Sequence, residues 1–193
     1  MNHSTQSYNE PNNFSFLEKN IAINRVSNVV PINVALSDRI GKRDFFLEKY
    51  NKGHHSFAQN QKSSKKIEVN TETLDESLKK FGSPPIGVIK MDIEGAEPIA
   101  LRGMADTLAR NPKVTIFTEI YPRSIHNLGE SALAYLEELR RLGFILSLID
   151  EDQKKLIPVN DFHKFLDSFP KGESFKNLYA VRAGVRDQSE NPA

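Results

Sequence analysis

The stretch that decides the fold is Ile86-Gly-Val-Ile-Lys-Met-Asp-Ile-Glu-Gly-Ala-Glu97. Its apolar strand formers are Val88, Ile89, Met91 and Ile93. Its charged residues gather around the carboxyl end, where Gly95 marks a turn into a helix: Lys90, Asp92, Glu94 and Glu97. Ligands of open α/β sheets bind beyond the carboxyl ends of the strands. Because an isolated buried charge is very costly, we expect these groups to be paired or to face a solvated cleft.

The composition is that of an ordinary soluble protein with one core. The chain has 193 residues and a formal net charge of +1, so no global field favours nucleic acid or an anionic membrane. It has no cysteine, which excludes disulfides and thiolate zinc sites. No apolar run is long enough to span a bilayer, and Met1–Ser7 lacks the apolar core of a signal peptide. We therefore expect a cytoplasmic protein that binds neither nucleic acid nor membrane.

Hydrophobic periodicity and capping signals predict alternating strands and helices. The predicted strands are 29–36, 43–48, 66–70, 86–93, 114–120, 144–149 and 178–183, and the predicted helices follow Pro11 and cover 73–81, 98–109, 129–142 and 160–169. From Ile86 onward, strands and helices alternate, which is typical of a mostly parallel sheet with helices on both faces. The long connection 150–177 leaves room for the final strand to run antiparallel to its neighbours.

Several segments resemble the FkbM methyltransferase family. The most specific is Lys90-Met-Asp-Ile-Glu-Gly-Ala-Glu97, followed by Leu101-Arg-Gly103. Weaker pieces follow in the family's order: Glu10–Phe14, Leu17–Asn20, Asn33–Asp38 with Gly41, Gly53–Ser56, Val69–Asp75, Thr118-Glu119 and Asn177–Ala180. The resemblance implies a Rossmann-like methyltransferase fold over residues 10–183. Residues 1–9, which are polar, and the tail 184–193 are expected to be disordered. The resemblance also implies S-adenosylmethionine as cofactor and, usually, the hydroxyl group of a small molecule or glycan as methyl acceptor.

One part of the family pattern is missing from this sequence. Family members begin with a strand and a glycine-rich turn of the Asp-x-Gly-x-x-x-Gly type, but no glycine precedes Gly41 here. We interpret the difference as the loss of the first strand and its cofactor turn by truncation. Two alternatives remain: another chain completes the sheet, or neighbouring strands close the gap. An unfilled gap would leave an apolar seam open to self-association or to a companion chain.

The catalytic candidates lie at the end of the motif strand. Asp92 is placed to hold an acceptor hydroxyl, take its proton or ligate a cation, although pairing with Lys90 or capping of the next helix would also explain it. Lys90 shares a face with Asp92 and would either pair with it or orient an acceptor oxygen. Glu94 and Glu97 flank Gly95, where a helix start favours carboxylates without any function.

Three further residues are candidates for cofactor binding together with Asp92. Glu10 resembles the acidic residue that accepts hydrogen bonds from the ribose hydroxyls in such folds. Ser37 and Asp38 resemble residues near the usual adenine position, but they fit a turn equally well. No metal site is predicted from these residues.

His54 and His55 are candidates for a general base, because imidazole ionises near neutral pH. They follow Gly53 in a polar loop, where paired histidines are more often plain surface residues. His126 lies after the strand 114–120 and is a weaker candidate on the acceptor side.

The sequence leaves three functions open. The first is methylation of a hydroxyl group by an FkbM-type enzyme, inactive if the truncation removes the cofactor site. The second is a non-catalytic remnant or partner-binding domain that keeps the acidic crevice. The third is a Mg²⁺-dependent hydrolase that uses Asp92, Glu94 and Glu119.

Overall fold

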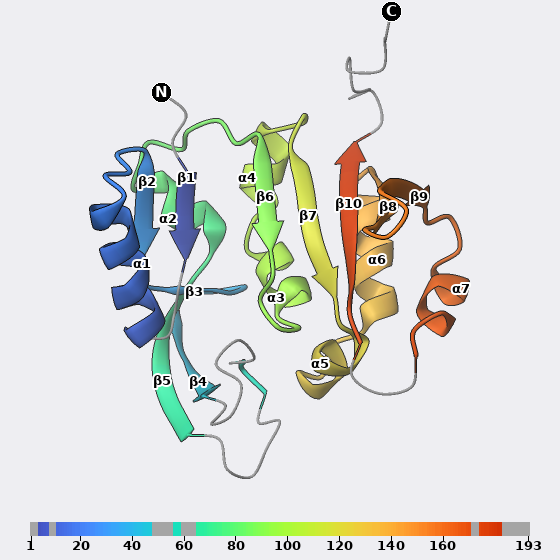
Figure 1. Ribbon diagram of the computed structural model, residues 1–193, viewed down its shortest axis with the longest axis horizontal. Helices are drawn as coiled ribbons and strands as arrows, with labels where there is room; N and C mark the ends of the chain where they lie inside the picture. The colour runs from blue at the N-terminus through green and yellow to red at the C-terminus, as the bar shows by residue number, and fades with distance from the viewer. Residues whose placement is uncertain (1–3, 8–10, 48–55, 59–64, 171–173, 183–193) are drawn as a thin grey trace, which may run out of the picture. The chain divides into compact units, whose positions relative to one another are not determined.

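The computed structural model describes residues 4–7, 11–47, 56–58, 65–170 and 174–182 (Figure 1). The chain divides into two compact units. Residues 1–82 and 99–104 form the first, and residues 83–98 and 105–193 form the second. None of the helices in the described ranges is both long and apolar enough to cross a bilayer.

The first unit begins with a βαβ arrangement. The strands β1 (Ser4–Ser7) and β2 (Val29–Ile32) pair in parallel, and helix α1 (Pro11–Ile23) connects them. Residues 4–7 were expected to be disordered because they are polar, but backbone pairing with β2 orders them as a strand. Side-chain polarity alone does not reveal such pairing, because its hydrogen bonds are made by the backbone.

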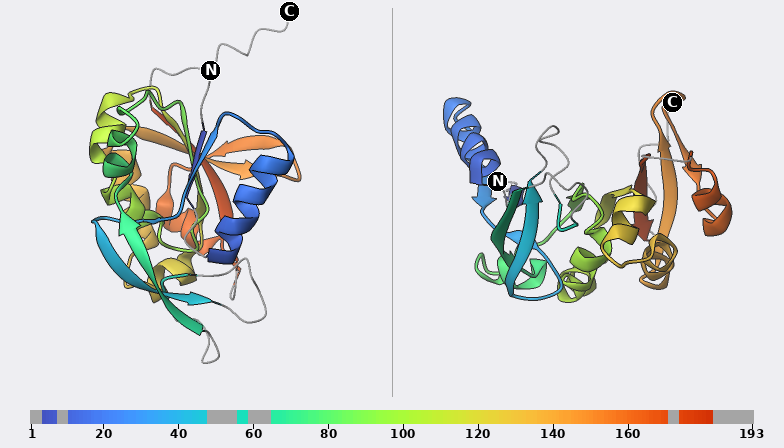
Figure 2. Two further views of the ribbon diagram at one scale, coloured as in Figure 1. Left: turned by 90° about the vertical axis from the view of Figure 1, so that its left-hand side faces the viewer. Right: turned by 90° about the horizontal axis from the view of Figure 1, so that it is seen from below.

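A second, three-stranded sheet completes the first unit. The order is β3 (Ala35–Leu36), β5 (Lys65–Glu72) and β4 (Gly41–Leu47), with β3 parallel and β4 antiparallel to β5. Figure 2 shows β4 and β5 running side by side. Their core is an apolar cluster in which partly buried side chains surround three buried ones: Ala35, Phe45 and Val69 at the centre, with Leu47, Phe57 and Ile67 around them.

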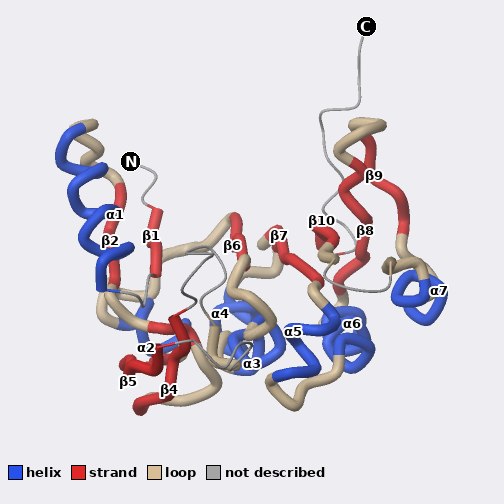
Figure 3. The backbone as a smooth tube through the Cα atoms, turned by 60° about the horizontal axis from the view of Figure 1, so that its bottom comes forward, coloured by secondary structure: helices blue, strands red, loops and turns tan. Residues whose placement is uncertain are grey.

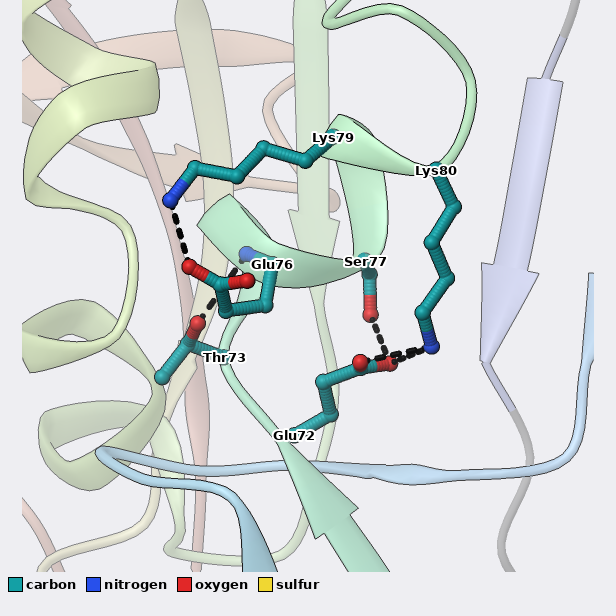
Figure 4. Close-up of polar contacts among 6 residues, drawn as sticks. All are labelled: Glu72, Thr73, Glu76, Ser77, Lys79 and Lys80. Atoms are coloured by element: carbon teal, nitrogen blue, oxygen red, sulfur yellow. Dashed lines mark hydrogen bonds and ion pairs between the residues drawn. The ribbon is translucent and has the colours of Figure 1, made fainter.

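Helix α2 (Leu74–Lys79) begins where its sequence predicts. The hydroxyl of Thr73 accepts a hydrogen bond from the Glu76 amide at 3.1 Å, which is one half of the expected capping box. In a complete capping box the Glu76 carboxylate would accept a hydrogen bond from the Thr73 amide, but here it pairs with Lys79 instead (Figure 4). The buried carboxylate of Glu72 accepts from the Ser77 hydroxyl at 2.8 Å and pairs with Lys80 at 2.6 Å (Figure 4).

The helix predicted over 98–109 divides at Gly103 into α3 (Glu97–Arg102) and α4 (Ala105–Arg110). Gly103 approaches the backbone of Ser37 so closely that a Cβ atom would lie 2.0 Å from the Ser37 carbonyl oxygen. Only glycine permits this approach. Glycine is also a poor helix former, so the interruption and the close packing have one common cause.

The second unit contains a five-stranded mixed sheet, in the order β6 (Val88–Met91), β7 (Thr115–Ile120), β10 (Lys176–Arg182), β8 (Phe144–Asp150) and β9 (Lys155–Pro158). Only β6 and β7 are parallel neighbours, because β10 lies antiparallel between β7 and β8 and β9 is antiparallel to β8. The prediction of a mostly parallel sheet was therefore wrong. The final strand does run antiparallel, as the long connection allowed.

The helices of the second unit are α4, α5 (Pro122–Asn127), α6 (Ala132–Arg141) and α7 (Phe162–Asp167). Figure 3 places α4, α5 and α6 on one side of the sheet, whereas helices were expected on both. The strands β6, β7 and β8 run in the same direction and succeed one another from one edge of the sheet toward the other, with β10 between β7 and β8. Right-handed crossovers between such strands put every connecting helix on the same face.

The core of the second unit lies between these helices and the sheet. Alternate residues of β7 and β10 are fully buried, including Ile116, Ile120, Leu178 and Ala180. Helix α6 contributes Leu136 and Leu139 from its apolar face, which the sequence pattern predicted. This packing fixes β7 and α6 beside the end of β6, where the candidate residues lie.

Candidate acidic site at the carboxyl end of β6

A tight turn joins β6 to α3. Glu94 and Gly95 have φ angles of 56° and 94°, and the Ala96 amide donates to the Ile93 carbonyl oxygen at 3.2 Å. Two consecutive positive φ angles are the pattern of a type I′ turn. The left-handed conformation costs a residue with a side chain about 1–2 kcal/mol, so the surrounding structure must hold Glu94 in place.

Gly95 lets this turn pack against α5. A Cβ atom on Gly95 would lie 2.5 Å from the Ser124 carbonyl carbon and 2.7 Å from the Ile125 amide nitrogen. Backbone atoms cannot move aside as a flexible side chain can. The glycine in the sequence motif therefore fixes the position of the turn in the second unit.

Glu97 closes the turn from its other end. Its side chain folds back so that Oε1 accepts a hydrogen bond from the Ile93 amide at 2.9 Å. The residue is 1% exposed, and its Oε2 atom has no hydrogen-bond partner among the described residues. Burial raises the pKa of Glu97 to about 7. Backbone hydrogen bonds lower this pKa, and the negative charges of Glu119 and Glu94 raise it further.

Glu94 is half-buried and also titrates near neutral pH. Burial raises its pKa to about 7, and the nearby negative charge of Asp92 adds to the effect. A carboxyl group with a pKa near the working pH is suited to accept and release a proton. The arrangement thus brings Glu94, Glu97 and Asp92 together at the end of one strand.

Lys90 and Asp92 form an ion pair with an Nζ–Oδ2 distance of 2.8 Å. Their side chains are 69% and 51% exposed, and an exposed pair of this kind contributes at most about 1 kcal/mol to stability. Of the alternatives for Lys90, pairing with Asp92 is the one that the structure shows. The Asp92 carboxylate remains accessible to solvent and hence to a ligand.

Ser37 and Asp38 belong to the first unit and are engaged within it. Ser37 is fully buried, and its hydroxyl donates to Asp38 Oδ1 at 3.1 Å. The Asp38 carboxylate also pairs with Arg43 at 3.7 Å and with Arg102 at 3.9 Å. This environment is that of a charged turn, which was the alternative interpretation of the segment. The remaining candidates, Glu10, His54 and His55, lie outside the described residues.

A buried polar pair near Glu97 was not predicted from the sequence. The Thr118 hydroxyl of β7 and the Tyr135 hydroxyl of α6 are 2.8 Å apart, and both residues are 2% exposed. Burial raises the pKa of Tyr135, the hydrogen bond with Thr118 opposes the rise, and the charge of Glu97 adds to it. The apolar spacing of 133–142 gave no sign of a polar role for Tyr135, because a tyrosine within a leucine-rich helix face is typical of a residue that only packs in the core.

The Mg²⁺-dependent hydrolase receives no support from the geometry. Within residues 11–47, 56–58, 65–170 and 174–182, no group of three or more histidine, aspartate or glutamate side chains is arranged to hold a metal ion. Such a group is what a carboxylate-based cation site requires.

Comparisons with known proteins identify the family of the chain and a solved structure of similar fold. Residues 4–146 match the family described as the methyltransferase FkbM domain. The fold is similar to that of a solved structure, the methyltransferase FkbM from Methylobacillus flagellatus KT, with a TM-score of 0.54 and 10% sequence identity. That match covers 93% of this chain and 36% of the solved chain, so the protein spans little more than a third of that relative. No curated protein matches the sequence. The chain belongs to the FkbM methyltransferase family.

Proposed function

We propose that the protein takes part in the S-adenosylmethionine-dependent methylation of a hydroxyl group on a small molecule or glycan, with the acidic turn after β6 on the acceptor side. The observation that carries this proposal is the placement of Glu94. It is held in a strained turn at the end of a sheet strand, and its pKa is near the pH at which a base must work. Family membership supports the reaction class and the cofactor.

The described residues fit such a cofactor at one point. The Asp92 side chain is 51% exposed and pairs with an exposed lysine, so its oxygens can also accept hydrogen bonds from hydroxyl or ammonium groups. Ser37 and Asp38 fit less well, because their side chains bond to one another and to arginines. When bound, S-adenosylmethionine supplies an electrophilic methyl group.

The chain's own residues would handle the acceptor. The Glu94 carboxylate takes the proton that leaves the hydroxyl as its oxygen gains the methyl group, and Lys90, held by its pair with Asp92, orients that oxygen from the exposed rim. The contribution of the protein is mainly positioning and local electrostatics. Glu94 suits this role because the turn fixes its backbone before any ligand arrives.

Titration calorimetry with S-adenosylmethionine tests the proposal. We expect heat of binding for the wild-type chain, and about tenfold weaker binding for Asp92→Asn, which removes one charge-assisted hydrogen bond. Glu138→Gln is a matched control, since Glu138 is a carboxylate on α6 that pairs with Arg141. Absence of heat at millimolar cofactor, or equal binding by Asp92→Asn, contradicts the proposal.

A second candidate, a partner-binding domain without catalysis, is favoured by the edge position of β6. In the part of the chain that the structure describes, β6 pairs with β7 on one side only, and Val88 is 61% exposed. An unpaired strand edge beside an exposed apolar side chain favours pairing with another strand. This candidate predicts self-association or a companion chain at β6, and Val88→Lys should reduce the sedimentation coefficient of the assembly. A wild-type chain that sediments as a monomer at all concentrations contradicts self-association.

A further inference from the structure

The side chain of Glu97 lies in an unusual environment. It is almost completely buried, its Oε1 atom accepts a hydrogen bond from the Ile93 amide, and its Oε2 atom has no partner in the described ranges. A buried carboxylate normally has a cation or several donors around it, because the charge is otherwise too costly. For Glu97, the structure shows backbone amide donors and neither a cation nor a side-chain donor within the described residues.

Two carboxylates act on Glu97 through their charges. Glu119 on β7 and Glu94 in the turn raise its pKa through their charges, and Tyr135 on α6 lies close enough to be affected by Glu97 in turn. The titratable residues of α5, which packs against Gly95, are Arg123 and His126. The two nearby carboxylates therefore favour a Glu97 that carries a proton.

We propose that Glu97 is a positioning residue that works as a neutral carboxylic acid, and that loss of its proton opens the turn Ile93–Ala96 and releases Glu94. The hydrogen bond from the Ile93 amide holds the amino side of the turn, and the Ala96 amide holds the carboxyl side. The Ile93 bond by itself favours the charged form, but burial of the charge is the larger effect, and an ionised Glu97 can reach solvent only by giving up the Ile93 amide. Glu94 then loses the framework that keeps it in a left-handed conformation.

The inference goes beyond the proposed function because it concerns the turn and needs neither cofactor nor acceptor. Any effect of the open turn on methyl transfer depends on the proposed role of Glu94 as the base. The turn itself can be measured in the chain alone, so a failure here is distinguishable from a failure to bind S-adenosylmethionine.

Amide hydrogen exchange at Ile93, resolved by NMR, provides the test. After correction for the intrinsic effect of pH, we expect protection of this amide in the wild-type chain to fall as the pH rises from 6 to 9. In Glu97→Gln the protection should be retained and independent of pH, because the amide side chain keeps an acceptor oxygen without a charge. In Glu97→Ala it should be lost at every pH.

The Glu76 amide is the internal control. It also donates to a side-chain oxygen, that of Thr73, but a hydroxyl does not titrate in this range. A second readout is the infrared band of a protonated carboxyl group, compared between Glu94→Gln and Glu94→Gln/Glu97→Gln at pH 6. The band should be present in the first and absent in the second.

Two results would overturn the inference. One is protection of Ile93 that does not change with pH in the wild-type chain. The other is loss of protection in Glu97→Gln to the level seen at high pH, which would mean that the charged form is needed. If Glu97→Ala does not fold, the wild-type chain and Glu97→Gln decide between these outcomes.

Discussion

Gly95 and Ser124 lie so close that a methyl group on Gly95 would overlap the carbonyl carbon of Ser124 at 2.5 Å. The turn after β6 therefore packs closely against the start of α5, and this contact fixes the positions of the acidic residues on either side of Gly95. Because the neighbouring atoms belong to the backbone, the contact cannot relax by a change of rotamer.

The substitution Gly95→Ala should therefore lower the free energy of unfolding by about 3 kcal/mol or more, from the positive φ and from the overlap together. Gly129→Ala is the matched control, because Gly129 has a φ of 76° but would meet nothing within 4 Å. It should cost only about 1–2 kcal/mol. Urea denaturation of both variants gives the comparison, and equal losses would contradict the packing argument.

The pair Thr118–Tyr135 predicts an asymmetric double-mutant cycle. Tyr135→Phe should cost about 1 kcal/mol, because the Thr118 hydroxyl keeps the Glu119 carbonyl oxygen as a weak acceptor at 3.4 Å. Thr118→Val should cost more, up to about 3 kcal/mol, because it leaves a buried phenol hydroxyl without its partner. The double variant should lose less than the sum of the two, as measured by chemical denaturation. Strict additivity would show that the two hydroxyls are not coupled.

Stability should depend on pH through Glu94 and Glu97. Burial raises the pKa of each from 4.5 to about 7, so the folded state binds more protons than the unfolded state between these values. Their contribution to stability is fully present below about pH 4.5 and is lost as the pH rises through about 7. The excess melting temperature of Glu97→Gln over the wild-type chain should grow across this window and then level off. A constant difference would show that Glu97 does not titrate within it.

Arg182 connects the ends of two helices of the second unit. Its Nε atom donates to the Leu142 carbonyl oxygen at 3.0 Å, and its Nη1 atom donates to that of Leu108 at 2.8 Å. Arg182→Lys should cost about 1–2 kcal/mol, since an ammonium group cannot make both bonds of the planar guanidinium. Arg110→Lys is the control, because exposed Arg110 makes one bond within its own helix, to the Asp106 carbonyl oxygen, and should change stability little. Thermal melts of the two variants check the difference.

Local signals predicted much of the secondary structure. The cap at Thr73, the strand 88–91 and the apolar face of α6 all depend on residues that are close together in the sequence, so pattern and propensity suffice to identify them. The strands β1 and β9 were missed because their order comes from pairing with β2 and β8. The division at Gly103 was missed because its cause, the backbone of Ser37, is distant in the sequence.

For the candidate site, the sequence alone identified the acidic turn, the glycine at its centre and the family to which the pattern is similar. Only the tertiary structure decided the environment of each acid, since it exposes Lys90 with Asp92 and buries Glu97 beside Glu119. It also decided the direction of β10, which lies between two strands far from it in the chain. The physical reason is that a charge acquires its pKa and a strand its partners from non-local neighbours, whereas a turn or a helix cap is built from adjacent residues.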